Sequence, residues 1–143
     1  MYVFDVGREH TLHDAGKFTL KKRFYDVACT RRGDDTLVAF ANSHRSRVAL
    51  KRLVSQQRLR LKRLAKVDIT EPLWLLFRGD LLLVADWNST TKTHTIVSFR
   101  ASGNALTERR VLLEDRFHEF RWALAGERHV IASLNELLVY EFS

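Results

Sequence analysis

The side chains that could bind a metal are few and lie near the start of the chain. His10 and His13 are three residues apart and Asp14 follows, a spacing that suits metal ligands. A structural zinc site needs four ligands, usually including pairs of cysteines. Only Cys29 could join the three, and it falls in a predicted inner strand. We therefore expect the histidines to lie in a polar surface turn, with no metal and no cofactor.

Cys29 could also act as a nucleophile beside a histidine base. No local sequence signature accompanies it, and the favoured interpretation is a buried cysteine that packs as a small hydrophobic residue. The six glycines are scattered, so the sequence has no glycine-rich loop of the kind that binds phosphate. The sequence therefore predicts a protein without catalytic residues that is not an enzyme.

Positive charge is concentrated in one part of the chain. Residues 17–66 hold fifteen Lys and Arg against three Asp, a net charge of +12, whereas the whole chain carries +7. A block of one sign attracts a polyanion or an acidic protein surface. The alternative interpretation is a solvated sheet face, on which Lys and Arg keep exposed strands soluble. The candidate contacts to nucleic acid or to an acidic partner are Arg45, Arg47, Lys51, Arg52, Arg58, Arg60, Lys62 and Arg63.

A pattern that occurs three times indicates which elements would position these residues. It reads Gly-acid-x-x-aliphatic-aliphatic-Ala-x-x-Asn and begins at Gly33, Gly79 and Gly126. The glycines are 46 and then 47 residues apart, and a period of about 20 to 50 residues indicates a repeat architecture. Because Gly followed by an acid favours a tight turn between two apolar runs, each copy predicts a β-hairpin.

Further apolar runs extend each hairpin to a unit of four strands, which we name a to d. Taken from the start of the chain, the runs predict the order c-d, a-b-c-d, a-b-c-d, a-b-c. The first pair is Tyr2–Val6 with Phe18–Leu20. Residues 46–67 contain no Gly or Pro and also fit a helix. The alternation of charged and apolar residues in Arg58–Lys62 favours two strands instead.

Four short strands in a unit of roughly 45 residues are typical of a β-propeller blade. Over nearly its whole length the chain therefore resembles β-propeller repeat proteins, at the level of the class. Residues Gly79–Asn88 with Thr95–Phe99 are similar to a repeat of the NHL type, whereas the Gly-His and Trp-Asp pairs of WD40 repeats are missing. The resemblance implies an all-β chain of about three four-stranded antiparallel blades. Since closed propellers have about 4 to 8 blades, it implies a partial propeller.

The resemblance also implies one β-repeat domain, residues 1–143, with incomplete blades at both ends. The implied division is a partial blade 1–23, blades 24–69 and 70–116, and a partial blade 117–143. Incomplete blades have unpaired strand edges, which pair with further strands. We therefore expect a non-catalytic protein–protein interaction or scaffold module that acts within a larger protein or an oligomer. Binding of RNA or DNA through residues 17–66 is the alternative. The candidate interface residues are Tyr2, Trp87 and Tyr140.

The sequence predicts an intracellular protein, in the cytoplasm or nucleus, without membrane association. Cys29 is the only cysteine, so no disulfide can form within the chain. Residues 1–6 lack the basic region and apolar run of a signal peptide. The longest apolar runs, Leu73–Phe77 and Leu81–Ala85, are too short to span a bilayer.

Overall fold

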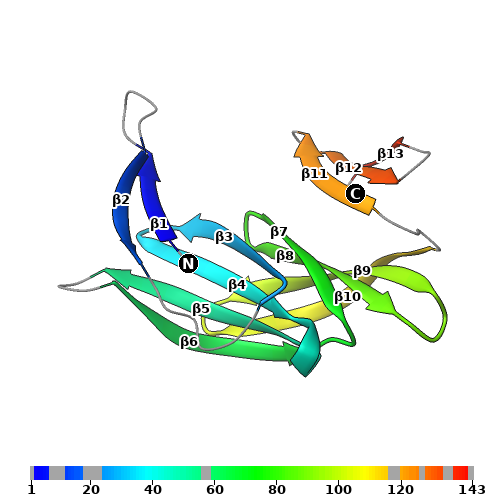
Figure 1. Ribbon diagram of the computed structural model, residues 1–143, viewed down its shortest axis with the longest axis horizontal. Coiled ribbons are helices and arrows are strands. Elements are labelled where there is room, and N and C mark those ends of the chain that lie inside the picture. Colours follow the sequence, from blue (N-terminus) through cyan, green and yellow to red (C-terminus); the bar gives the residue numbers. More distant parts are fainter. Residues whose placement is uncertain are drawn as a thin grey trace.

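The protein is built from antiparallel β-sheets (Figure 1). The computed structural model describes the backbone of residues 2–6, 12–17, 24–55, 59–115, 120–125, 128–133 and 137–141, and the side chains of residues 24–54 and 60–114. Within these ranges it contains thirteen strands and one short 3-10 helix. The all-β fold class is thus confirmed. No helix in the described ranges is long and apolar enough to cross a membrane.

Two sheets of four strands form the middle of the chain, each with its strands in chain order. The first sheet consists of β3 (Asp26–Arg32), β4 (Asp35–Asn42), β5 (Arg47–Ser55) and β6 (Leu59–Asp68), with the 3-10 helix η1 (Ser43–Arg45) between β4 and β5. The second sheet consists of β7 (Pro72–Arg78), β8 (Leu81–Asn88), β9 (Thr93–Ser102) and β10 (Ala105–Asp115).

Two smaller sheets precede and follow them in the chain. The N-terminal hairpin pairs β1 (Tyr2–Val6) with β2 (Leu12–Lys17). The C-terminal sheet has the order β11 (Phe120–Ala125), β12 (Arg128–Ser133) and β13 (Leu137–Glu141). The succession of two, four, four and three strands is the one that the repeat predicted.

The structure decides between the alternatives for residues 46–67 and corrects two predictions about the N-terminal hairpin. Residues 47–55 and 59–68 are strands, so the helical alternative for 46–67 is wrong. The partner of β1 is Leu12–Lys17 rather than Phe18–Leu20, which lie outside the described residues. His13 and Asp14 consequently lie in β2, where they pair with β1, and not in a turn. Pairing with a neighbouring strand outweighs the weak strand preference of such polar residues.

The glycines of the repeat form tight hairpin turns, as predicted for the first two copies. Gly33 and Gly79 have φ of +58° and +55°, and each is the first residue of a two-residue loop. Glycine is the residue that adopts this conformation without steric cost. Gly103 forms a third such turn, between β9 and β10, which the repeat did not predict. The loop of the third copy, 126–127, lies outside the described residues.

One middle strand of each four-stranded sheet, β4 in the first and β8 in the second, is buried on both of its faces. In β4 every residue from Leu37 to Asn42 is buried, and in β8 every residue from Leu82 to Asp86. Since successive side chains of a strand point to opposite faces, apolar material covers both sides of these strands. This explains why the repeat has an unbroken Leu/Val-Ala run rather than an alternating pattern.

One face of the first sheet packs against one face of the second, and we call these the contact faces. Strand β7 contacts β3 and β4, and β10 contacts β6, so the first strands of the two sheets lie beside each other and so do the last strands (Figure 1). The buried core between the sheets consists of Leu37, Ala39, Ala41, Val48, Leu50, Ile69, Leu75, Phe77, Leu82, Val84, Val97, Phe99 and Ala101.

Every second residue of strand β3 contacts the second sheet, through hydrogen bonds or apolar packing. A carboxylate oxygen of Asp26 accepts a hydrogen bond from the backbone N–H of Leu75 at 2.7 Å. Ala28 packs against the shared core. Thr30 and Arg32 donate to backbone carbonyls of the second sheet, those of Gly79 at 3.2 Å and Ala101 at 2.9 Å. Asp26, Ala28, Thr30 and Arg32 therefore make up the contact face of β3.

The other face of β3 is open to solvent, which corrects the expectation for the cysteine. Val27 is 48% exposed, and Cys29 is exposed rather than buried. The apolar run of β3 resembles that of β4 in the sequence, but β3 lies at an edge of its sheet and buries mainly its contact face.

The hydrogen bond from Leu75 to Asp26 predicts a specific loss of stability. We expect Asp26→Ala to lower the free energy of unfolding by about 1.5–3 kcal/mol, because it removes a charged acceptor and leaves a part-buried N–H without a partner. Urea unfolding followed by circular dichroism would measure this. Asp34→Ala, at an exposed turn, is the matched control and should change stability by less than about 0.5 kcal/mol. Equal losses in both variants would contradict the role of Asp26.

Candidate basic site

Strand register divides the basic residues of the first sheet between its two faces. Arg47 and Lys51 of β5 lie opposite Asn42 and Val38 of β4, on the face that points away from the second sheet. We call this the outer face. Arg52, the next residue after Lys51, belongs to the contact face.

A β-bulge in β6 brings two further cations to the outer face. Arg63 pairs with Lys51, and Lys66 pairs with Ala49, although Arg63 and Lys66 are an odd number of residues apart. In a regular strand such residues would lie on opposite faces. The extra residue is Leu64, which packs against the core, and its insertion restores the phase.

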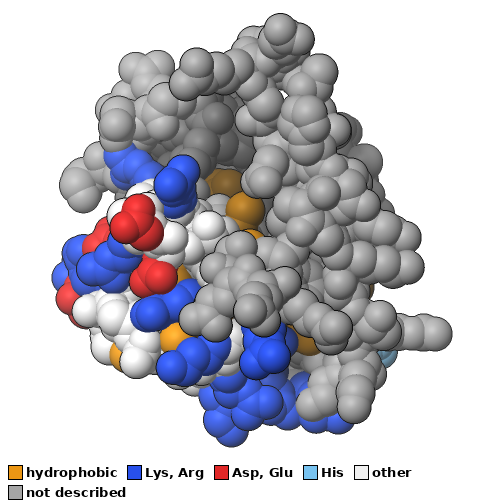
Figure 2. Space-filling model, turned by 90° about the vertical axis from the view of Figure 1, so that its left-hand side faces the viewer, with side chains coloured by type: hydrophobic (Ala, Val, Ile, Leu, Met, Phe, Trp, Pro, Cys, Tyr) orange, Lys and Arg blue, Asp and Glu red, His pale blue; other side chains and the backbone are white. Residues whose placement is uncertain are grey.

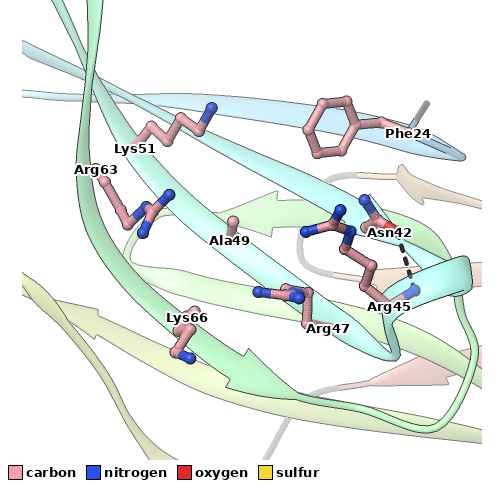
Figure 3. Close-up of a pocket in the computed structure, with 8 residues that line it drawn as sticks. All are labelled: Phe24, Asn42, Arg45, Arg47, Ala49, Lys51, Arg63 and Lys66. Atoms are coloured by element: carbon pink, nitrogen blue, oxygen red, sulfur yellow. Dashed lines mark hydrogen bonds between the residues drawn. The ribbon is translucent and has the colours of Figure 1, made fainter. Parts of the chain in front are cut away.

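These residues line a small pocket on the outer face, with a volume of about 70 Å³ (Figure 3). The lining consists of Phe24, Asn42, Arg45, Arg47, Ala49, Lys51, Arg63 and Lys66. Figure 3 shows the guanidinium group of Arg63 turned toward those of Arg45 and Arg47 across the short side chain of Ala49. The pocket opens to solvent, because Arg45, Arg63 and Lys66 are exposed.

The turn before β5 positions Arg45 at the rim of the pocket. The side chain of Asn42 accepts a hydrogen bond from the backbone N–H of Arg45 at 3.1 Å and so caps η1. Ser46 then adopts a left-handed conformation, with φ of +48°, and the chain enters β5. Asn42, the last residue of the repeat pattern, thus starts a turn that places a cation at the pocket.

Phe24 is the aromatic residue of the pocket lining, and its ring contacts the buried ring of Phe40. The rings of Phe24 and Phe40 have centroids 4.8 Å apart. The ammonium group of Lys51 lies 4.9 Å from the centroid of Phe40 and 5.8 Å from that of Phe24. Both distances suit a cation–π contact, which holds the Lys51 side chain against the rings.

Five of the eight lining residues are cations, and no acidic side chain lines the pocket. Among the described side chains, Arg45, Arg47, Arg63 and Lys66 form no ion pair. The Nε of Arg47 is buried and has no hydrogen-bond partner there. Like charges repel one another, and a buried donor without an acceptor is unfavourable. The pocket can therefore accept an anionic group that supplies both charge and acceptors.

The structure brings together four of the eight basic residues that the sequence singled out, namely Arg45, Arg47, Lys51 and Arg63. Lys66 completes the set and was missed, because the alternating pattern of Arg58–Lys62 gave no sign of the bulge. The one sequence signal that could have revealed Lys66 is a basic residue that breaks the alternation of charged and apolar residues in the strand.

Three of the other four predicted contacts lie away from the pocket. Arg52, Arg60 and Lys62 lie on the contact-face side of their strands. Arg52 forms an ion pair with Asp35 at 3.4 Å and a long hydrogen bond to Asn104 at 3.5 Å, so it links the first sheet to the β9–β10 turn. Arg58 lies outside the described residues.

The surface around these strands is rich in positive charge (Figure 2). Lys and Arg side chains cover the lower edge of this view, whereas acidic side chains lie higher up and among other Lys and Arg. Cations on the two faces of one strand can still act together at longer range, because their fields add. The pocket directs several of them at one point.

The candidate interface residue Trp87 lies at the end of β8, beside a buried histidine. It is partly exposed, and its ring lies 4.5 Å from that of His94, which is 5% exposed. Burial lowers the pKa of His94 below its ordinary value. The side chains of Tyr2 and Tyr140 lie outside the described ones, and their backbones belong to β1 and β13.

Comparison with protein-family models, with curated proteins and with solved structures finds no match to this chain. Among the described residues, no three His, Cys, Asp or Glu side chains gather in a way that could hold a metal ion. The geometry of the chain itself is therefore the basis for inference about its function.

The buried His94 predicts how stability depends on pH. Below about pH 6.5 the unfolded chain binds a proton on this imidazole more readily than the folded protein does, so stability falls as pH falls from 6.5 toward the lowered pKa. Above about pH 6.5 the imidazole of His94 is neutral in both states, so it adds nothing to the change of stability with pH. We expect His94→Gln to flatten the slope by at most about 1.4 kcal/mol per pH unit. Urea unfolding between pH 5 and pH 8 would test this, with the exposed His44→Gln as control. An unchanged slope in His94→Gln would contradict the prediction.

Proposed function

We propose that the chain is a non-catalytic protein–protein interaction module of β-propeller type that works within a larger protein or an oligomer. The observation that carries this proposal is the face-to-face packing of two four-stranded antiparallel sheets, with the first strand of one beside the first strand of the other and the last beside the last. Consecutive blades of a propeller have this relation. An intracellular location, in the cytoplasm or nucleus, is part of the same proposal.

Burial of strands β4 and β8 on both faces also supports the proposal of a propeller-type module. Phe40 of the first sheet and Leu83 of the second point away from the contact faces, yet neither is exposed at all. In a sandwich of only two sheets, the outward faces would be solvated and polar. The apolar outward residues of β4 and β8 favour further layers over these strands, whereas the outer face of β5 and β6 is polar and open to solvent at the basic pocket.

Open strand edges supply a means of assembly. Strand β13 pairs with β12 alone and β1 pairs with β2 alone, so each has one edge that accepts no strand of the described chain. Such edges expose unpaired backbone N–H and C=O groups and readily add a strand from another chain. A fourth strand beside β13 would make the C-terminal sheet equal to the two in the middle.

The proposal predicts that the isolated chain self-associates. Light scattering during size-exclusion chromatography should give a mass of at least twice the 16.7 kDa of one chain at micromolar concentration. Hydrogen exchange should show amide protection of residues 137–141 that decreases on dilution, because dilution dissociates the added strand. A 16.7 kDa species that unfolds cooperatively and whose exchange does not change with dilution would contradict assembly through this edge.

Binding of RNA or DNA through residues 17–66 is the second candidate, favoured by the cations on both faces of β5 and β6. The structure gives it less support than it gives assembly. Single-strand binding combines a basic track with exposed aromatic platforms. Tyr25 is the one aromatic residue among the large hydrophobic side chains that are exposed in the described part.

The nucleic-acid candidate predicts strong dependence on salt. If a single-stranded RNA binds, the logarithm of its association constant should fall linearly with the logarithm of salt concentration. Reversing Arg60, Lys62 and Arg63 to Glu should then reduce the steepness of that dependence, because phosphate contacts release counterions. Fluorescence anisotropy with a labelled oligonucleotide would measure both. RNA binding that ignores salt or survives the triple reversal would exclude this surface.

A further inference from the structure

The pocket on the outer face of the first sheet has the composition of an anion-binding site. Guanidinium groups from two separate segments, Arg45 and Arg47 on one side and Arg63 on the other, face each other across Ala49 (Figure 3). The small side chain of Ala49 leaves the space between them open. A buried Nε–H of Arg47 lacks an acceptor among the described residues.

We propose that this pocket binds a phosphate group. A phosphate carries up to two negative charges and presents several acceptor oxygens, which match converging guanidinium forks better than a single carboxylate does. The ammonium groups of Lys51 and Lys66 add two further positive charges to the lining. The inference does not depend on the propeller-type assembly, because the pocket is formed by β4, η1, β5 and β6 together with Phe24.

The shape of the site favours a compact anion over a nucleic-acid strand. The cavity is about 70 Å³ and its cations converge on one point. A strand of RNA would instead need cations spread along a groove. The neighbouring cations Arg52, Arg60 and Lys62 lie on the opposite side of the same strands, where they cannot extend the pocket. The expected occupant is therefore free phosphate or a phosphomonoester.

Adjacent residues of β6 provide a matched pair of variants. Arg63 lines the pocket, whereas Lys62 points to the opposite side of the strand, and both are exposed. Arg63→Gln and Lys62→Gln each remove one positive charge, so they change the general field around the strand equally. Only the first removes a donor from the pocket. Binding of phosphate, pyrophosphate and O-phosphoserine would be measured by isothermal titration calorimetry at low ionic strength.

We expect Arg63→Gln to weaken binding about tenfold or more, in keeping with loss of a charged hydrogen bond, and Lys62→Gln to weaken it less than about threefold. Lys66→Gln, a second pocket variant, should also weaken binding more than Lys62→Gln does. Circular dichroism would establish that each variant is folded. Tightest binding of O-phosphoserine would identify a phosphomonoester as the occupant, and tightest binding of phosphate or pyrophosphate would identify the free anion.

Two results would overturn the proposal. One is the absence of detectable binding of all three probes at millimolar concentration by the folded protein. The other is equal weakening by Lys62→Gln and Arg63→Gln, which would assign binding to the general charge of the sheet. A single-stranded oligoribonucleotide that binds while none of the three probes does would favour a nucleic-acid surface in place of the pocket. Self-association is measured separately, so failure of one proposal leaves the other intact.

Discussion

Burial of strands β4 and β8 on both faces is the constraint on which the rest of the structure depends. Because β4 and β8 bury consecutive residues, each four-stranded sheet needs a layer on either side. The contact faces meet each other and form the shared core. The backbone N–H and C=O groups of a strand with both faces buried must find their hydrogen-bond partners within the sheet. Pairing with a neighbouring strand on each side is therefore also required. The tight Gly-containing turns follow, because they join adjacent strands within two residues.

Edge strands, by contrast, can leave one face open to solvent. In this chain their side chains form polar contacts. Strand β3 keeps a single buried face, in which Asp26, Thr30 and Arg32 bond the backbone of the neighbouring sheet. Hydrogen bonds of this kind are directional, so they fix how far one sheet slides over the other, whereas apolar packing alone would tolerate several arrangements. The basic pocket arises in the same way, on the outer face near edge strand β6.

The regular part of this fold could be predicted from the sequence, and the irregular part could not. The thrice-repeated turn and apolar run indicated the strand number and order, because they encode local geometry and burial together. The position of β2 and the exposure of Cys29 depend on tertiary pairing and on edge position, which local pattern does not encode. Half of the basic residues chosen from charge alone proved to line the pocket. Register and a single bulge decided this for the described residues of β5 and β6, and the Asn42 cap decided it for Arg45.

Because of the bulge at Leu64, the side chains on the outer face depend on the number of residues in β6 as well as on their types. Deleting one residue between Arg63 and Lys66 would leave every charge in the chain yet move one of these cations toward the core of Ala65 and Val67. A conservative exchange such as Arg63→Lys would disturb the surface far less than this shortening. During divergence of related sequences, insertions and deletions in β6 would therefore redistribute charge between the two faces more abruptly than substitutions could.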